Sequence, residues 1–275
     1  MSRALRRRRA AGLSLVELLV SMTLVATLTA GGLAAYARAQ ATWRAQSADQ
    51  RRTERAQYVF STLEPELQMA GYFGRARPAA PLPESAVPLA VRDCGADVIA
   101  RLDRPVERRA SLPTRCLPLA ARVAGSHVLL IRRASARLAA PRAGRAQWLT
   151  AGEPAVQGAL LWDGQIPPGS VDPELRDLVV RLYYVARGAD GDSRTPALRV
   201  KTLTEVAGAP AFIDTEVMPG VDSLEVELLP DSSPRSVRLT LRIRADTDDT
   251  DAREAPRLLS VTRHFSLRNA ASDAP

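Results

Sequence analysis

The stretch GLSLVELLVSMTLVATLTAGGLAAYA, residues 12–37, decides the structure of the amino-terminal part of the chain. Residues 18–37 are 20 consecutive uncharged residues, and a helix of that length spans roughly 30 Å, the thickness of a bilayer's hydrocarbon core. Glu17 stands at the start of this span, a few residues after four consecutive arginines at 6–9. Placing a carboxylate in lipid costs roughly 2.5–3.5 kcal/mol. Glu17 therefore needs a partner.

The residues around Glu17 resemble the signal of type IV prepilins. A short basic leader ends at Gly12, and an apolar helix follows with Glu17 at its fifth position. The resemblance implies that a prepilin peptidase cuts after Gly12 and methylates the new amino group on Leu13. It also implies that Glu17 pairs with the amino terminus of a neighbouring subunit in a helical filament, which sets the carboxylate against an opposite charge. The family most often begins with Phe or Met, where this chain has Leu13.

Two other interpretations of the amino terminus remain open. The arginines and the apolar run could form a secretory signal peptide that is removed after Ala37, because residues 35–37 fit an A-x-A site. Against this, the apolar run exceeds the usual length of about 7–15 residues, and Glu17 interrupts its start. Alternatively, the helix is a plain signal anchor, with Glu17 reaching the membrane interface. The dense arginine cluster before Gly12 favours an amino terminus in the cytoplasm.

The helical pattern continues beyond the apolar span. Val59, Leu63 and Leu67 form a stripe at i, i+4 and i+8, which predicts an amphipathic helix whose apolar face lies on a sheet. Gly71 is expected to end this helix. We therefore divide the chain into a cleaved leader (1–12), a transmembrane and filament-core helix (13–37), an amphipathic continuation (38–71) and a β-rich head (72–275).

Beyond residue 125 the hydrophobic period changes to the alternation that is typical of strands. It is clearest in residues 223–229 and 235–245, which predict an antiparallel hairpin with Glu facing Arg on its polar side. Further strands are expected at 127–132, 159–162, 178–186, 197–204 and 258–267. The sequence thus predicts an α+β fold in which a long amino-terminal helix packs on an antiparallel sheet, the architecture that the prepilin resemblance also implies.

Cys94 and Cys116 are the two cysteines of the chain. In a chain that is expected to be exported, an even number of cysteines favours a disulfide, and closing this loop would stabilise the fold by about 3 kcal/mol. The segment 75–125 contains seven prolines and needs such a constraint. A metal site is disfavoured because the two thiols lack further ligands at a suitable spacing. We expect no metal and no other cofactor.

Charge and composition give little support to nucleic-acid binding. The net charge is +8, but the leader holds five arginines and no acid, so the remainder has 33 basic and 30 acidic residues. A single Lys against 37 Arg indicates a compositional bias, and only 12 aromatic residues are available to stack on bases. A solvated Arg-rich surface is the preferred interpretation.

No catalytic motif is present. His127 and His264 each fall in a predicted strand, without a nucleophile or carboxylate in a known motif beside them, so we expect no enzyme activity. The acidic loop 246–254 has the carboxylate density of a calcium site. However, Asp251 and Arg257 stand where an EF-hand requires Gly and Glu, which favours a solvated loop.

Two segments resemble the PilW family of minor pilins: ELQMAGYFG (66–74) at the end of the long helix and RHFSLRN (263–269) in the last strand. The resemblance implies a subunit of the inner membrane, with its head in the periplasm, that helps to initiate type IV pilus assembly and stays at or near the tip. Its partners would be the prepilin peptidase, other minor pilins, the major pilin, the inner-membrane assembly platform and a large tip adhesin. A GspJ-like minor pseudopilin of type II secretion and an adhesive or DNA-uptake module are the alternatives.

Overall fold

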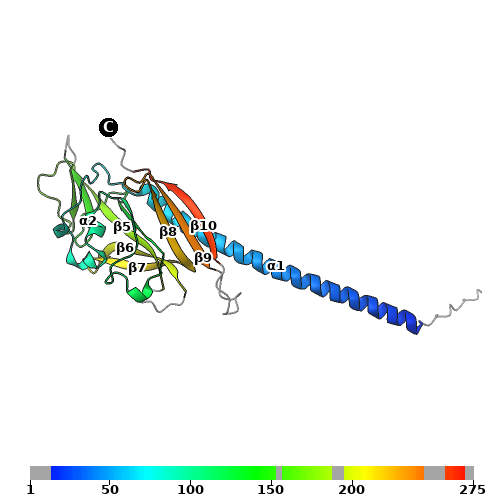
Figure 1. The fold of residues 1–275 in the computed structure, drawn as a ribbon. Coiled ribbons are helices and arrows are strands. Elements are labelled where there is room, and N and C mark those ends of the chain that lie inside the picture. Colours follow the sequence, from blue (N-terminus) through cyan, green and yellow to red (C-terminus); the bar gives the residue numbers. More distant parts are fainter. Residues whose placement is uncertain (1–13, 153–156, 188–194, 245–257, 270–275) are drawn as a thin grey trace, which may run out of the picture. The chain divides into compact units, whose positions relative to one another are not determined.

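The computed structural model describes residues 14–152, 157–187, 195–244 and 258–269. The chain divides into two compact units, residues 1–50 and 51–275, with the boundary inside helix α1 (Leu15–Met69). The strands of the head are β1 (Val106–Arg109), β2 (Val128–Ala134), β3 (Gln147–Ala151), β4 (Gln157–Leu161), β5 (Glu174–Ala186), β6 (Ala197–Val206), β7 (Ala209–Pro219), β8 (Val221–Leu229), β9 (Ser236–Arg244) and β10 (Leu258–Ser266), and several are labelled in Figure 1.

The described strands form two antiparallel sheets. A seven-stranded sheet is organised around the 13-residue strand β5, which pairs with β2, β3 and β6. A second sheet has the order β10-β9-β8, and its strands lie side by side in Figure 1. This α+β arrangement, a long apolar amino-terminal helix followed by an antiparallel head, is the predicted pilin-like architecture. The head uses two sheets where one was expected.

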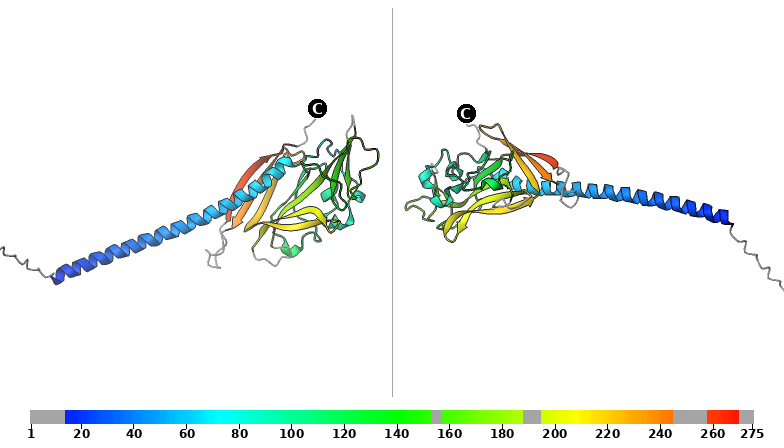
Figure 2. Two further views of the ribbon diagram at one scale, coloured as in Figure 1. Left: turned by 180° about the vertical axis from the view of Figure 1, so that it is seen from behind. Right: turned by 60° about the horizontal axis from the view of Figure 1, so that its bottom comes forward.

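The last turns of α1 form part of the core of the head. Val59, Leu63 and Leu67 are fully buried, as their spacing predicted. They share a cluster with side chains of β2 and β5 and with the inner faces of β8 and β9. Figure 2 shows these turns of α1 against the strands. Their burial confirms the predicted apolar face, which packs against both sheets.

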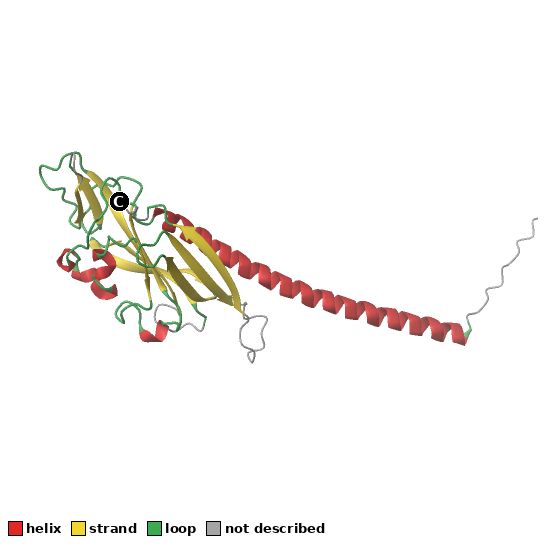
Figure 3. Cartoon of the chain, turned by 45° about the horizontal axis from the view of Figure 1, so that its top comes forward, coloured by secondary structure: helices red, strands yellow, loops and turns green. Residues whose placement is uncertain are grey.

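The opposite face of the seven-stranded sheet is covered by the Pro-rich segment. Alternation along β2 sends Leu129 and Ile131 toward α1 and Val128 and Leu130 to the other side. There they share a buried cluster with residues of the short helices η2 (Leu89–Cys94), α2 (Asp97–Ala100) and η3 (Leu119–Ala121). Another short helix, η1 (Glu84–Ala86), precedes these in the chain, and Figure 3 shows short helices beside the strands. A core on both faces explains why β2 is buried along most of its length.

The predicted hairpin is confirmed. Strand β8 pairs antiparallel with β9, with Glu227 opposite Arg238. The side-chain oxygen of Glu227 lies 2.7 Å from an Arg238 nitrogen, and that of Glu225 lies 2.8 Å from Arg242. Helix α1 ends at Met69, and Gly71 follows with φ +79°, a backbone conformation that glycine adopts without strain. Strands β1, β3 and β7 were not predicted.

Candidate functional site

The first turn of α1 is closed by a reciprocal cap. The backbone N–H of Ser14 donates to Glu17 Oε2 at 3.1 Å, and the backbone N–H of Glu17 donates to Ser14 Oγ at 3.3 Å. This is a capping box, in which two otherwise unpaired N–H groups of the helix start gain partners. The S-x-x-E spacing at 14–17 is the sequence signal for it, and the prediction for Glu17 missed it.

Glu17 is the acidic residue in the first turn of α1. A negative charge there is favoured by the helix dipole, since unsatisfied N–H groups leave partial positive charge at a helix start. Gly12 and Leu13, the predicted cleavage site, lie outside the described residues. Their processing therefore stays a prediction, as does the pairing of Glu17 with another subunit.

The amino-terminal half of α1 is apolar and exposed along its length. All side chains from Ser14 to Gln46 are exposed, and by length and composition this helix could cross a membrane. The hydroxyls of Ser21, Thr23 and Thr27 each donate to a backbone carbonyl of the same helix at 2.9 Å. These polar groups are therefore satisfied internally, as an apolar environment requires.

These features occur within a known signal. Residues 7–33 match the prokaryotic N-terminal methylation motif. The methylation motif supports a type IV pilin-like protein or a pseudopilin, and it implies processing by prepilin peptidase and assembly with pilus components. Together, the methylation motif and the apolar helix fit a membrane-anchored pilin that is part of a pilus. No curated protein and no solved structure matches the chain.

A second carboxylate of α1, Glu66, holds the helix to the head. It is only 8% exposed, and its oxygens accept two hydrogen bonds from Arg133 of β2 at 3.1 Å. Arg181 of β5 approaches to 2.7 Å. No role was predicted for Glu66, although a carboxylate beside the apolar stripe that ends at Leu67 indicates a charged partner in the core.

The buried Arg132 organises the segment around β1. Its side chain is fully buried. Three backbone carbonyls accept its hydrogen bonds, and Glu107 Oε2 lies 2.9 Å from its Nη2. Burial lowers the pKa of Arg132 to about 10, against the opposing effect of Glu107. Arg132 therefore stays charged at neutral pH and ties β1 and α2 to β2.

A disulfide joins Cys94 and Cys116, with 4.6 Å between their Cα atoms. Both cysteines are buried in the core under the seven-stranded sheet. The bond links the end of η2 to the loop before η3. It therefore constrains the Pro-rich segment 75–125, whose composition does not by itself favour a single conformation.

Both histidines hold neighbouring strands. His127 Nδ1 accepts the backbone N–H of Val226 at 3.0 Å, and His264 Nε2 accepts a hydrogen bond from Arg238 at 3.1 Å. Among the described residues, no group of three or more His, Cys, Asp or Glu side chains could hold a metal ion. The acidic loop 246–254 lies outside them, so the interpretation of that loop stays a prediction.

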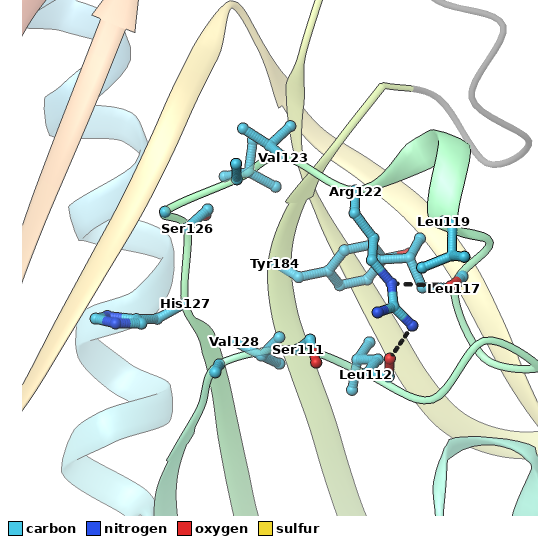
Figure 4. Close-up of a pocket in the computed structure, with 14 residues that line it drawn as sticks. Ser111, Leu112, Leu117, Leu119, Arg122, Val123, Ser126, His127, Val128 and Tyr184 are labelled. Atoms are coloured by element: carbon cyan, nitrogen blue, oxygen red, sulfur yellow. Dashed lines mark hydrogen bonds between the residues drawn. The ribbon is translucent and has the colours of Figure 1, made fainter.

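The head contains an apolar cavity of about 330 Å³ beside Tyr184. Figure 4 shows Arg122 at its side, where the guanidinium donates to the carbonyls of Leu112 and Leu117. The Tyr184 hydroxyl donates to Asp214 at 2.6 Å, and burial raises the pKa of this tyrosine. These polar groups have partners within the chain, so the cavity offers apolar contacts rather than acid–base chemistry.

Proposed function

We propose that this chain is a minor pilin of the PilW type that helps to initiate type IV pilus assembly and sits at or near the pilus tip. The observation that carries the proposal is one helix with two different halves. The first half bears the methylation motif and exposes its apolar side chains, and the second half is built into a β-rich head. The work of the chain would be assembly rather than catalysis.

The exposed half of α1 needs an apolar surrounding. Leu18, Leu24 and Leu28 are 47%, 57% and 75% exposed, and complete burial of such a side chain is worth about 1.5–3 kcal/mol. The bilayer provides this before assembly, with the head in the periplasm, and a bundle of pilin helices provides it afterwards. The helix can therefore leave the membrane without a large free-energy cost only if it then contacts other subunits.

Glu17 would guide that step. Cleavage after Gly12 would leave a positive amino group on Leu13, and the Glu17 carboxylate of one subunit would pair with the amino terminus of the next. An opposite charge offsets the cost of a carboxylate in a low-dielectric bundle. The proposed partners are other minor pilins, the major pilin, the inner-membrane assembly platform and a large tip adhesin, with prepilin peptidase as the processing enzyme.

The Glu17→Gln variant tests the proposal. Glutamine can still accept the Ser14 hydrogen bond, so membrane insertion and the head should stay intact. Removing one partner of a buried charge pair costs about 3–5 kcal/mol, so piliated cells should become fewer at an unchanged protein level. Glu54→Gln, which removes an exposed charge from the same helix, is the matched control. Normal piliation and normal co-purification with other minor pilins would contradict the role of Glu17.

Two further measurements separate the alternatives. Intact-mass analysis should find a methylated terminus at Leu13, whereas a terminus at Arg38 would support a removed signal peptide. A strain that lacks this chain should lose its surface pili and retain secretion. Loss of secretion with normal pili would favour a GspJ-like pseudopilin. Normal pili and normal secretion with loss of surface attachment or DNA uptake would favour a binding module.

A further inference from the structure

A polar cavity of about 750 Å³ lies in the head. Three segments line it: Arg77 after the long helix, residues 103–108 leading into and forming β1, and residues 228–234 at the turn between β8 and β9. A Cβ placed on Gly71 would lie 3.1 Å from the Pro105 side chain. The cavity is therefore at the end of the head where α1 ends.

Two acidic side chains of the lining, Asp103 and Glu107, pair with arginines that lie outside the lining. Asp103 accepts hydrogen bonds from Arg101 at 3.2 and 3.3 Å. Glu107 lies 2.9 Å from both Arg109 and Arg132. None of these three arginines lines the cavity. With Asp103 and Glu107 paired in this way, the lining residues that remain charged are Arg77, Arg104 and Arg108, with Asp231 opposing them.

Two of those arginines have no partner of opposite charge. Within the part of the chain that the structure describes, the guanidinium groups of Arg77 and Arg104 make no hydrogen bond or ion pair. All three arginines are exposed at the surface, and partial desolvation lowers the pKa of Arg77 below its usual value. The third, Arg108, is 3.9 Å from Asp231, whose side chain is 74% exposed. An anion that enters the cavity would therefore find two guanidinium groups without an ion-pair partner and a third, that of Arg108, with only a weak one.

The backbone of two lining residues, Arg104 and Pro105, is held by hydrogen bonds from Arg132. The buried Arg132 donates from its side chain to the Arg104 carbonyl at 2.6 Å and from its backbone N–H to the Pro105 carbonyl at 2.8 Å. Ser232 and Ser233 of the turn between β8 and β9 also line the cavity. A site whose backbone is already ordered loses less entropy when it binds.

We propose that this cavity binds an oxyanion group, a carboxylate or a phosphate, between Arg77, Arg104 and Arg108. The planar fork of a guanidinium matches two oxygens of either group, and charge-assisted hydrogen bonds of this kind are among the stronger ones in proteins. The inference concerns the head alone and stands whether or not the chain initiates pili.

The test is calorimetric titration of the full chain in detergent micelles with citrate and, separately, inorganic phosphate, at an ionic strength held constant with chloride. One-to-one binding is expected, and comparing the two anions identifies the preferred oxyanion. Arg77→Gln and Arg104→Gln should each weaken binding roughly tenfold. Arg115→Gln, which changes an arginine that is exposed like Arg77 and Arg104 but does not line this cavity, should bind like the parent chain.

A gain-of-affinity variant sharpens the test. Asp231→Asn removes the competing carboxylate, so oxyanion binding should tighten roughly threefold, the size of an exposed ion pair. Thermal unfolding of every variant separates lost binding from lost folding. Absence of binding by the folded parent chain, parental affinity in Arg77→Gln and Arg104→Gln, or weaker binding by Asp231→Asn would each overturn the proposal.

Discussion

The two halves of α1 place the same residue types in opposite surroundings. Leu24 in the first half is 57% exposed, whereas Leu63 in the second half is fully buried in the head. Their carboxylates differ in the same way, since Glu17 caps its own helix, while Glu66 accepts hydrogen bonds from the sheet. The second half has its partner within the chain. The first half has an apolar surface whose partner is a bilayer or another subunit.

The largest effect that separates the two halves is expected from leucine truncation. Leu63→Ala leaves a cavity between α1 and both sheets, so the free energy of unfolding of the head should fall by about 2–5 kcal/mol. Leu24→Ala should change it by less than about 0.5 kcal/mol. Denaturant unfolding of both variants in detergent, followed by tryptophan fluorescence, measures the difference. Equal losses would show that the first half also belongs to the folding unit of the head.

A smaller difference is expected between two neighbouring carboxylates of the second half. Glu66→Gln leaves Arg133 and Arg181 without their anionic partner, so the head should lose about 1–3 kcal/mol of stability. Glu64 has a side chain that is 40% exposed and lies 3.9 Å from Arg263, and Glu64→Gln should cost less than about 0.5 kcal/mol. The same unfolding measurement applies. A loss in Glu66→Gln no greater than in Glu64→Gln would mean that Glu66 does not hold the helix to the sheet.

Ser14→Ala tests the cap of the first half. Loss of the hydroxyl acceptor should destabilise the first turn by about 1 kcal/mol, because the Glu17 N–H loses its partner. Hydrogen exchange of the first-turn amides should accelerate, while unfolding of the head should not change. Unchanged exchange in the variant would contradict a stabilising capping box.

The smallest effect concerns pH and is expected in the head alone. Burial raises the pKa of Glu107, but Arg132 and Arg109 more than offset this, so the pKa lies below its ordinary value of 4.5. A depressed carboxyl pKa contributes stability that is complete above the unfolded-state pKa and is lost as pH falls through the folded-state pKa. Head stability should therefore decline below about pH 4.5, with a shallower decline in Glu107→Gln. An identical pH dependence in both proteins would contradict this contribution.

The regular elements with strong local patterns were predicted well. Helix α1 follows from an apolar run and a three- and four-residue stripe, and the β8–β9 hairpin follows from strict alternation around a turn. The unpredicted strands carry weaker patterns. Strand β1 is the four-residue VERR, and β7 mixes exposed and half-buried residues and contains a register shift opposite β6. Strand β1 forms by pairing with β2, which is distant from it in the sequence, and β7 pairs with β6 in a register that shifts. Residue composition does not indicate such pairing.

The sequence alone determined which half of α1 needs an external apolar partner, where the processing signal lies, and which face of the helix enters the head. These properties depend on residues a few positions apart, so periodicity and spacing reveal them. Only the tertiary structure decided that Glu66 meets Arg133 and Arg181, that Arg132 is buried against β1, and that Arg77 joins Arg104 and Arg108 at one cavity. These contacts join segments many residues apart, and their energies depend on burial and on the direction of each side chain, which the folded chain sets as a whole.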